Sequence, residues 1–282
     1  MNVAQLLDDA TVLIAAALGL EKREARIEAR ALAGLAWEVD PVWLIAHDTD
    51  LLKDTQIAAF HSLLSRRLEG EPMAYILGER EFFGLTLQVT SDVLIPRPDT
   101  ETLVQAVLDQ TPADRPCRIL DLGTGSGAIA LALATHRPLA QILAVDRSPA
   151  ALDVARNNAI HLGLRNVLFI RSDWYAQLGV RNFDIIAANP PYIPMEDTHL
   201  YQGDLRFEPL EALQSDDGGL ADIRRIVAGA PSHLSHGGWL LFEHGYDQGK
   251  ASQALLWQSG WSQVHTRMDL SGLPRVSGGQ RL

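Results

Sequence analysis

From Arg118 onward the chain alternates short apolar segments that suit buried strands with longer segments that suit helices. The strand-like segments end near Asp121, Val145, Ile170 and Ala188. Such alternation is typical of a mostly parallel sheet with helices on both faces. We therefore predict a doubly wound, Rossmann-like α/β fold for this part, completed by a pair of strands near the carboxyl terminus.

The individual elements follow from local patterns. Strands are expected over 119–121, 141–145, 167–170, 183–188 and 238–242, and helices over 128–134, 149–162 and 220–230. The front of the chain differs, because helix-period patterns run over 3–18, 23–37 and 55–68, with a short helix after Asp40-Pro41. This predicts a small helical bundle that is separate from the α/β part.

Between the two parts the pattern changes again. Aromatic and branched residues broken by Gly78 and Gly84 predict a β-hairpin over 74–90. The expected organisation is thus a helical domain over 1–75, a hairpin and extended linker over 76–98, and an α/β domain over 99–282. Asp99 or Thr100 is expected to cap a helix through Leu108.

Composition and charge exclude several classes of protein. The chain has 47% hydrophobic and 21% charged residues, as globular proteins do, and a formal net charge of −11. That charge disfavours a broad phosphate-binding surface and hence bulk nucleic acid as a partner. Cys117 is the single cysteine, the amino terminus lacks signal-peptide features, and the longest early apolar stretch is too short to span a bilayer. We expect a cytoplasmic protein with no membrane role.

The strand expected over 183–188 leads directly into Asn189, Pro190, Pro191 and Tyr192. Ligands of open α/β sheets bind at the carboxyl ends of strands. Two prolines make the turn stiff and remove two N–H donors, so the turn offers carbonyl oxygens and the Asn189 amide. Tyr192 adds an aromatic face. The motif therefore predicts a rigid site for a planar –NH2 group.

The turn after the first α/β strand reads Asp121, Leu122, Gly123, Thr124, Gly125, Ser126 and Gly127, and glycines at alternate positions let a backbone approach a ligand closely. Asp146 follows nineteen residues after Gly127, where an acidic residue that binds a ribose is expected. The alternative is a tight turn with Asp146 capping the next helix. The pair favours a nucleoside ligand, and Asp173-Trp174 ends the next strand where an adenine would lie. A dinucleotide would more usually show GxGxxG.

Together these motifs resemble a class I methyltransferase. Four more segments extend the resemblance to the bacterial release factor glutamine methyltransferase family, over essentially the whole chain: IPRPDTE at 95–101, RFEPL at 206–210, EHG at 243–245 and DLSGLPR at 269–275. The resemblance implies methyl transfer from S-adenosylmethionine to the side-chain nitrogen of the glutamine in the Gly-Gly-Gln loop of peptide chain release factors. It also implies that the helical domain recognises the substrate.

The resemblance assigns roles to residues. It places S-adenosylmethionine against Gly123, Thr124, Gly125, Ser126, Gly127, Asp146, Trp174 and Asn189, and the glutamine against Asn189, Pro190, Pro191 and Tyr192. Asn189, Pro190 and Tyr192 are the expected catalytic residues. No metal is expected, since His233 and His236 lack a third nearby ligand. The partner is a release factor, the enzyme is expected to be a monomer, and the roles of Arg97, Glu208 and Glu243 stay open.

The chemistry of a carboxamide supports those roles. Its nitrogen is a poor nucleophile, because the lone pair is delocalised into the carbonyl. If the Asn189 side-chain oxygen and the Pro190 carbonyl each accept one N–H, the nitrogen is fixed against the methyl donor. No general base is required within the motif.

Two other functions remain as alternatives. The same motif suits a methyltransferase acting on adenine N6 or cytosine N4 of DNA, although we find no DNA-reading module. A regulatory protein that binds the cofactor without turnover is the second. Separately, the chain contains its own Gly278, Gly279 and Gln280. We interpret this as coincidence, with a flexible tail acting as a pseudo-substrate as the competing hypothesis.

Overall fold

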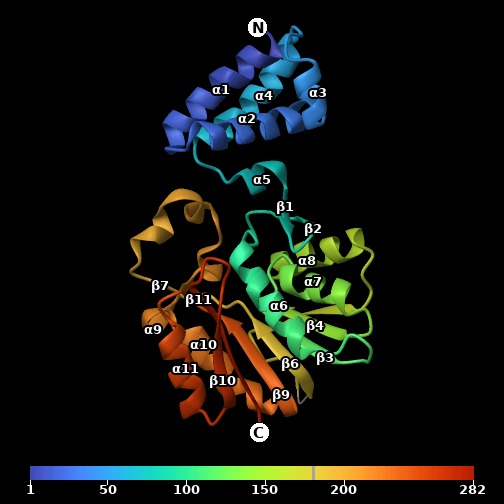
Figure 1. Cartoon of the computed structure of the whole chain (residues 1–282), viewed down its shortest axis with the longest axis vertical. Coiled ribbons are helices and arrows are strands. Elements are labelled where there is room, and N and C mark those ends of the chain that lie inside the picture. The colour runs from blue at the N-terminus through green and yellow to red at the C-terminus, as the bar shows by residue number, and fades with distance from the viewer. Residues whose placement is uncertain (180–181) are drawn as a thin grey trace. The chain divides into compact units, whose positions relative to one another are not determined.

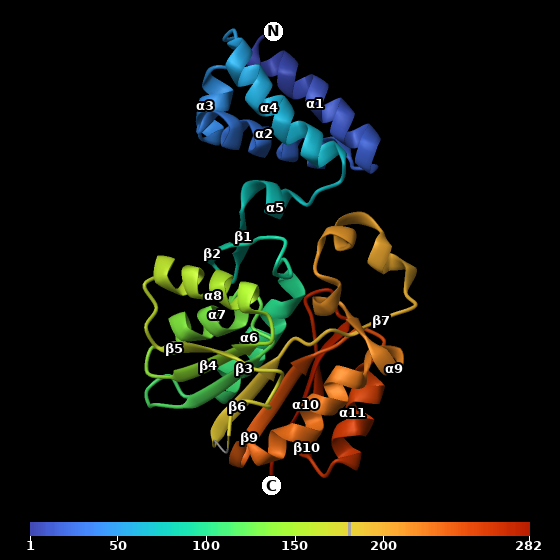
Figure 2. The same ribbon diagram turned by 180° about the vertical axis from the view of Figure 1, so that it is seen from behind.

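A computed structural model describes residues 1–179 and 182–282 (Figure 1, and from behind in Figure 2). The chain forms two compact units, Met1–Glu79 and Arg80–Leu282. No helix in the described residues is both long enough and apolar enough to span a bilayer.

The first unit is the expected helical bundle. Its helices are α1 (Val3–Leu18), α2 (Lys22–Trp37), α3 (Pro41–Ala46), α4 (Asp54–Leu68) and α5 (Met73–Leu77). Asn2 caps α1 by accepting the Gln5 N–H at 2.8 Å, and Gly19 ends that helix in the left-handed conformation. The apolar faces meet in one core that includes Leu6, Leu32 and Phe60.

Helix α5 corrects a prediction. Ala74–Leu77 was expected to begin the hairpin, but Pro72 starts a helical turn there and Gly78 ends it with φ of 76°. Ile76 is buried in the core of the bundle. The aromatic and branched residues at the start of this segment were misleading, because Ile76 packs against the helices of the bundle. The hairpin itself is shorter, with strands β1 (Glu79–Phe82) and β2 (Leu85–Gln88).

The second unit contains the predicted doubly wound sheet. In the described chain the sheet has seven strands, ordered β10-β11-β9-β6-β3-β4-β5. Their bounds are β3 (Arg118–Leu122), β4 (Gln141–Asp146), β5 (Val167–Arg171), β6 (Phe183–Ala188), β9 (Leu234–Glu243), β10 (Ser262–Met268) and β11 (Pro274–Gln280). Strand β11 pairs antiparallel with both β9 and β10, and the other pairings are parallel.

Helices cover both faces of this sheet. They are α6 (Glu101–Gln110), α7 (Ala128–His136), α8 (Pro149–His161), α10 (Ala221–Gly229) and α11 (Gly249–Gln258). Helices α6, α7 and α8 lie on one face, and α10 and α11 lie on the other (Figures 1 and 2). Alternate strand residues supply the two cores, as Ile119 and Leu120 do on opposite faces. The sequence analysis missed α11, although Ala, Gln and Leu in it favour a helix.

Short elements complete the unit. They are the strands β7 (Ile193–Pro194) and β8 (Gln214–Ser215), the turn α9 (Asp216–Gly219), and 3-10 turns at Pro98–Thr100, Thr198–Tyr201, Gly203–Phe207, Leu210–Ala212 and Ala230–Ser232. The hairpin is tied to this unit, since Asn158 of α8 accepts the Gln88 N–H at 2.7 Å and donates to the Gln88 carbonyl.

The topology fixes where a ligand can bind. After β3 the chain adds β4 and β5 on one side, and then β6 and β9 on the other. The loops after β3 and β6 therefore diverge at the carboxyl edge, which leaves a crevice between them. The glycine turn and the Asn189 motif follow those two strands.

The carboxyl-terminal Gly-Gly-Gln is part of the sheet and not a flexible tail. Gly278 lies in β11, where an added Cβ would be 2.5 Å from the Leu240 carbonyl oxygen. Gln280 donates to the Gly237 carbonyl at 2.8 Å. The pseudo-substrate hypothesis is therefore wrong, because the segment is held by hydrogen bonds of the sheet on both sides.

Candidate functional site

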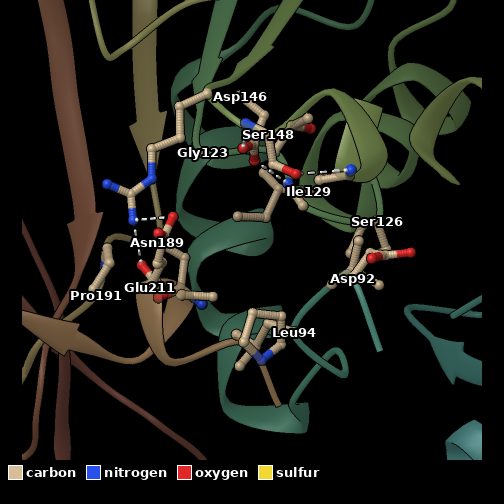
Figure 3. Close-up of a pocket in the computed structure, with 18 of the residues that line it drawn as sticks. Asp92, Leu94, Gly123, Ser126, Ile129, Asp146, Ser148, Asn189, Pro191 and Glu211 are labelled. Atoms are coloured by element: carbon tan, nitrogen blue, oxygen red, sulfur yellow. Dashed lines mark hydrogen bonds and ion pairs between the residues drawn. The ribbon is translucent and has the colours of Figure 1, made fainter. Parts of the chain in front are cut away.

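A cleft with about 1170 Å³ of empty space, part of it open to solvent, lies at this crevice. Residues following β3, β4, β5 and β6 line it, together with the segment before α6. Figure 3 shows Gly123, Asp146 and Ser148 grouped together, and Asn189, Pro191 and Glu211 grouped apart from them. The topology thus brings the two predicted motifs into one cavity.

The glycine turn is bound to the end of the next strand through Asp146. Its carboxylate accepts the Gly125 N–H and the Ser148 N–H, each at 2.9 Å, with one oxygen for each. Gly125 has φ of 55°, and an added Cβ there would meet nothing within 4 Å of protein. The turn therefore presents open space beside a carboxylate that retains acceptor capacity, as a ribose diol requires. Burial raises the pKa of Asp146, against the effect of these N–H donors.

Trp174 forms an aromatic wall of the same cleft. Its indole Nε1 donates to Asp222 at 3.2 Å, and its ring lies close to Gly123, where an added Cβ would be 3.3 Å from it. The residue has φ of 46°, and the Ser172 hydroxyl donates to its carbonyl at 2.8 Å. A non-glycine residue in this conformation costs energy and persists where the surroundings impose it. The hydrogen bonds with Ser172 and Asp222 therefore hold the ring where a flat ligand could contact it.

Asn189 lies in the cleft at the end of β6, and its amide is oriented by Thr100. Asn189 Nδ2 donates to Thr100 Oγ1 at 3.1 Å. In the described chain no hydrogen bond reaches Asn189 Oδ1, so that oxygen is available to a ligand. Thr100 precedes α6 but its side chain does not cap the helix, and Asp99 pairs with Arg275 at 3.2 Å. The predicted capping role for these two residues is wrong, since the Thr100 hydroxyl bonds to Asn189 and the Asp99 carboxylate pairs with Arg275.

Hydrogen bonds fix both the hydroxyl and the main-chain carbonyl of Tyr192. Its hydroxyl donates to Glu243 Oε1 at 3.0 Å, and its carbonyl accepts from Gln248 Nε2 at 3.0 Å. Glu243 is only 1% exposed, and burial raises its pKa to about 7. These bonds fix the turn that carries Asn189.

Gly219 lies directly against the main chain of Tyr192, where there is no room for a side chain. An added Cβ there would be 2.1 Å from the Tyr192 carbonyl oxygen, and Gly219 has φ of 85°. We expect Gly219→Ala to displace the turn and lower kcat/KM by about 10- to 100-fold, since small misplacements of reacting groups cost about two orders of magnitude. Steady-state kinetics and thermal melting measure this.

The neighbouring glycine provides the matched control. Gly218 also has a positive φ, of 63°, but a Cβ there meets nothing within 4 Å. Gly218→Ala should lower stability by about 1–2 kcal/mol, the cost of a left-handed alanine, with a nearly normal rate. Equal kinetics for the two variants would show that contact with Tyr192 is irrelevant.

A buried ion pair connects the segment before α6 to the loop after β7. Glu208 accepts the Ile95 N–H at 3.0 Å and also the Arg97 guanidinium. Its side chain is fully buried, and burial raises its pKa while Arg97 acts against that shift. Because the Glu208 end of the pair is buried, although the Arg97 side chain is 32% exposed, this is not an ordinary surface ion pair. A second ion pair, between the largely exposed side chains of Arg147 and Glu211, is 3.0 Å long.

Asp121 lies beneath the glycine turn, and its burial makes the stability of the folded protein depend on pH. It is fully buried, its Oδ2 accepts the Thr124 hydroxyl at 2.6 Å, and burial raises its pKa to about 7. The unfolded carboxyl loses its proton near pH ~4. Between these two pH values the folded chain binds more protons than the unfolded chain does. The contribution of Asp121 to the free energy of unfolding is therefore complete below about pH 4 and is lost as the pH rises through 7.

We expect Asp121→Asn to remove that contribution. The wild type should lose on the order of 1–4 kcal/mol more unfolding free energy than the variant between pH ~4 and ~7.5, measured by urea denaturation. Asp184→Asn is the control, since Asp184 is exposed and accepts, among the described residues, the Arg118 N–H. If the unfolding free energy of Asp121→Asn depends on pH as that of the wild type does, the raised pKa of Asp121 is contradicted.

Most of the predicted ligand-binding residues lie together. Gly123, Thr124, Gly125, Ser126, Asp146, Trp174, Asn189 and Pro191 line the cleft. Gly127, Pro190 and Tyr192 do not. Gly127 caps α7 and packs against Leu131 and Ala155, Pro190 is buried, and Tyr192 contacts Glu243.

Sequence reasoning missed several residues of the site. Thr100, Gln248 and Asp222 each contact a predicted residue from a distant part of the chain. Of these three residues only Thr100 could have been found from the sequence, because it lies in the IPRPDTE segment at 95–101 that contributes to the family resemblance. Within the described residues no group of three or more His, Cys, Asp or Glu side chains could hold a metal ion.

Comparisons with known proteins place both parts of the chain in known families. Residues 98–204 match the model of the methyltransferase small domain, and residues 5–78 match that of the PrmC N-terminal domain. The chain is 51% identical over 255 residues to the release factor glutamine methyltransferase of Bordetella pertussis, covering 90% of this chain and 94% of that protein. It is 47% identical to the Escherichia coli release factor glutamine methyltransferase, covering 84% and 86% respectively.

Solved structures support the fold. The 16S rRNA N2 G1207 methyltransferase of Thermus thermophilus, in complex with AdoMet and guanosine, aligns with a TM-score of 0.54 at 19% identity, over 72% of this chain and 50% of that one. A Pyrococcus furiosus methyltransferase aligns with a TM-score of 0.52 at 18% identity, over 77% and 96%. Both similarities concern the class I methyltransferase fold alone.

Proposed function

Because this chain belongs to the release factor glutamine methyltransferase family, we propose that its cleft holds S-adenosylmethionine beside a release factor glutamine whose amide binds Asn189. The chain is an S-adenosylmethionine-dependent enzyme that methylates the side-chain amide nitrogen of that glutamine. The observation that carries the site assignment is the free Asn189 Oδ1 in the same cleft as the Asp146 carboxylate.

The residues of the cleft fit S-adenosylmethionine. Gly123 to Ser126 would hold its methionine part, Asp146 its ribose hydroxyls, and Trp174 its adenine. The charged residues that line the cleft are five acids (Asp92, Asp146, Asp173, Glu211 and Asp222) and two bases (Arg97 and Arg147). This acidic excess suits a cofactor with net positive charge and disfavours the pyrophosphate of a dinucleotide. When bound, the cofactor supplies an electrophilic methyl group on its sulfonium.

The chain's own residues orient the glutamine nitrogen. Asn189 Oδ1 would accept one of its N–H bonds. The main-chain carbonyl of Pro190, a residue that is itself buried beside the cleft lining, would accept the other, which aims the nitrogen lone pair at the methyl group. Acceptance by these oxygens also stabilises the positive charge that develops on the nitrogen during transfer. Tyr192 acts through the turn that it fixes, since its hydroxyl is bound by Glu243. Catalysis rests on position and on fixed dipoles. The N–H proton becomes acidic only as the methyl group is transferred and then leaves to water, so no general base is needed in the motif.

The remaining features belong to the same proposal. The helical unit, Met1–Glu79, recognises the release factor, and the Gly-Gly-Gln loop of that factor presents the glutamine. The enzyme acts as a cytoplasmic monomer. Nucleic acid is not its direct substrate, which the net charge of −11 supports.

Methyl transfer from labelled S-adenosylmethionine tests the proposed substrate. The acceptors are a release factor, the same factor with its loop glutamine replaced by alanine, and duplex DNA. We expect label on the intact factor alone, at its loop glutamine by mass spectrometry. Label on the replaced factor would contradict the acceptor, label on DNA would support a base substrate, and none on any of them would support a cofactor-binding protein without turnover.

A further inference from the structure

The amide of Asn189 can present either of two opposite faces to a ligand. With Oδ1 in the cleft, Asn189 accepts a hydrogen bond, and with Nδ2 in the cleft it donates one. A glutamine –NH2 group needs an acceptor, whereas a glutamate carboxylate needs a donor. The orientation of this one amide therefore decides which of two nearly isosteric side chains the cleft favours.

Thr100 determines that orientation. Thr100 is 4% exposed, and its hydroxyl accepts from Asn189 Nδ2 at 3.1 Å. This contact joins residues 89 positions apart in the chain, so it is not a feature of the Asn189 turn itself. A hydroxyl could in principle either donate to Asn189 or accept from it, and its own surroundings must select one.

Glu243 makes that selection. Burial raises the pKa of Glu243 to about 7, and the nearby Thr100 hydroxyl acts against that shift by favouring the ionised carboxyl. Glu243 Oε2 has no hydrogen-bond partner among the described residues, so it is an open acceptor beside Thr100. When Glu243 is ionised it can only accept, and the Thr100 proton then turns toward Glu243. The Thr100 lone pair is then left for Asn189 Nδ2. On its other oxygen Glu243 accepts the Tyr192 hydroxyl, at 3.0 Å.

We propose that Thr100 is a specificity-determining residue: by holding Asn189 Nδ2 it keeps Oδ1 toward the substrate, and the cleft selects a carboxamide over a carboxylate. The inference rests on the proposed function, in which Asn189 receives the glutamine. Thr100 acts through Asn189 and is a positioning residue. A carboxylate opposite Asn189 Oδ1 would place two acceptors together and leave both unpaired.

The test compares two forms of a release factor, with glutamine or glutamate in the loop. Their dissociation constants are measured with S-adenosylhomocysteine present, which prevents turnover. For the wild-type enzyme we expect the glutamate form to bind about 10- to 100-fold more weakly, the cost of an unsatisfied buried polar group. In Thr100→Val, which keeps the shape and loses the hydroxyl, the ratio should fall below about threefold, and kcat should fall more than KM rises.

Two variants separate positioning from packing. Thr100→Ser restores the hydroxyl and should restore the ratio. Thr111→Val also removes a buried hydroxyl of the same unit, one that bonds to the Val107 carbonyl of α6, and should keep the wild-type ratio and rate. A wild-type ratio in Thr100→Val, or a collapsed ratio in Thr111→Val, would overturn the proposal.

Asn189→Ala distinguishes this inference from the function on which it rests. It should abolish the selectivity as Thr100→Val does. If Asn189→Ala retains both the rate and the ratio, the proposed role of Asn189 fails. If Asn189→Ala loses them while Thr100→Val does not, only the role of Thr100 fails.

Discussion

Asn189→Ala is expected to lower kcat by about 100- to 1000-fold, because it deletes the side-chain acceptor for the substrate's amide. Removing one preorganised polar group from a transition-state site costs about 2.7–4 kcal/mol. Thr100 already fixes the amide, so little of this stabilisation is spent on ordering the side chain during reaction. Single-turnover rates with release factor and S-adenosylmethionine measure the loss.

The control for this variant is another half-buried asparagine. Asn166 donates to main-chain carbonyls, among them that of Arg137 at 3.2 Å, and lies outside the cleft. Asn166→Ala should lose stability and keep the rate. Calorimetry with S-adenosylmethionine should show nearly unchanged affinity in Asn189→Ala, and a normal rate in that variant would remove Asn189 from the mechanism.

Asp146→Ala is expected to weaken S-adenosylmethionine binding by at least about 100-fold. The variant would lack the carboxylate that binds the ribose hydroxyls. Hydrogen bonds to a charged group contribute about 1.5–3 kcal/mol each. The variant would also lose the bond from the Gly125 N–H, which ties down the glycine turn. The dissociation constant of the cofactor measures the effect.

Asp184→Ala serves as the reference for Asp146→Ala. Asp184 also accepts a main-chain N–H, from Arg118 at 2.8 Å, but from the start of β6 at the other edge of the sheet. Its variant should bind the cofactor normally. If Asp146→Ala also binds normally, Asp146 is a structural cap, which is the alternative reading of the glycine-turn motif.

The sheet and the two central motifs could be predicted because their signals are local. A buried strand followed by glycines or by Asn-Pro-Pro-Tyr identifies both a turn and its place at the sheet edge. Parallel strands then bring such turns together without further information. Gly123, Asp146 and Asn189 were found in this way and lie in one cleft.

The supporting residues could not be predicted because their partners are remote in sequence. Thr100 reads as a helix cap until its contact with Asn189 is seen, and Gly219 reads as an ordinary turn glycine until the Tyr192 carbonyl is placed beside it. The terminal Gly-Gly-Gln reads as a tail, although its register with β9 buries it. In each case tertiary packing outweighed a plausible local reading.

A crystal structure of the enzyme with S-adenosylhomocysteine and a release factor tests the central claim most directly. We predict that the loop glutamine nitrogen lies about 2.7–3.2 Å from both Asn189 Oδ1 and the Pro190 carbonyl oxygen, and faces the cofactor sulfur. Asn189 Nδ2 should remain on Thr100. A glutamine held by other residues, or one facing Asn189 Nδ2, would contradict the account.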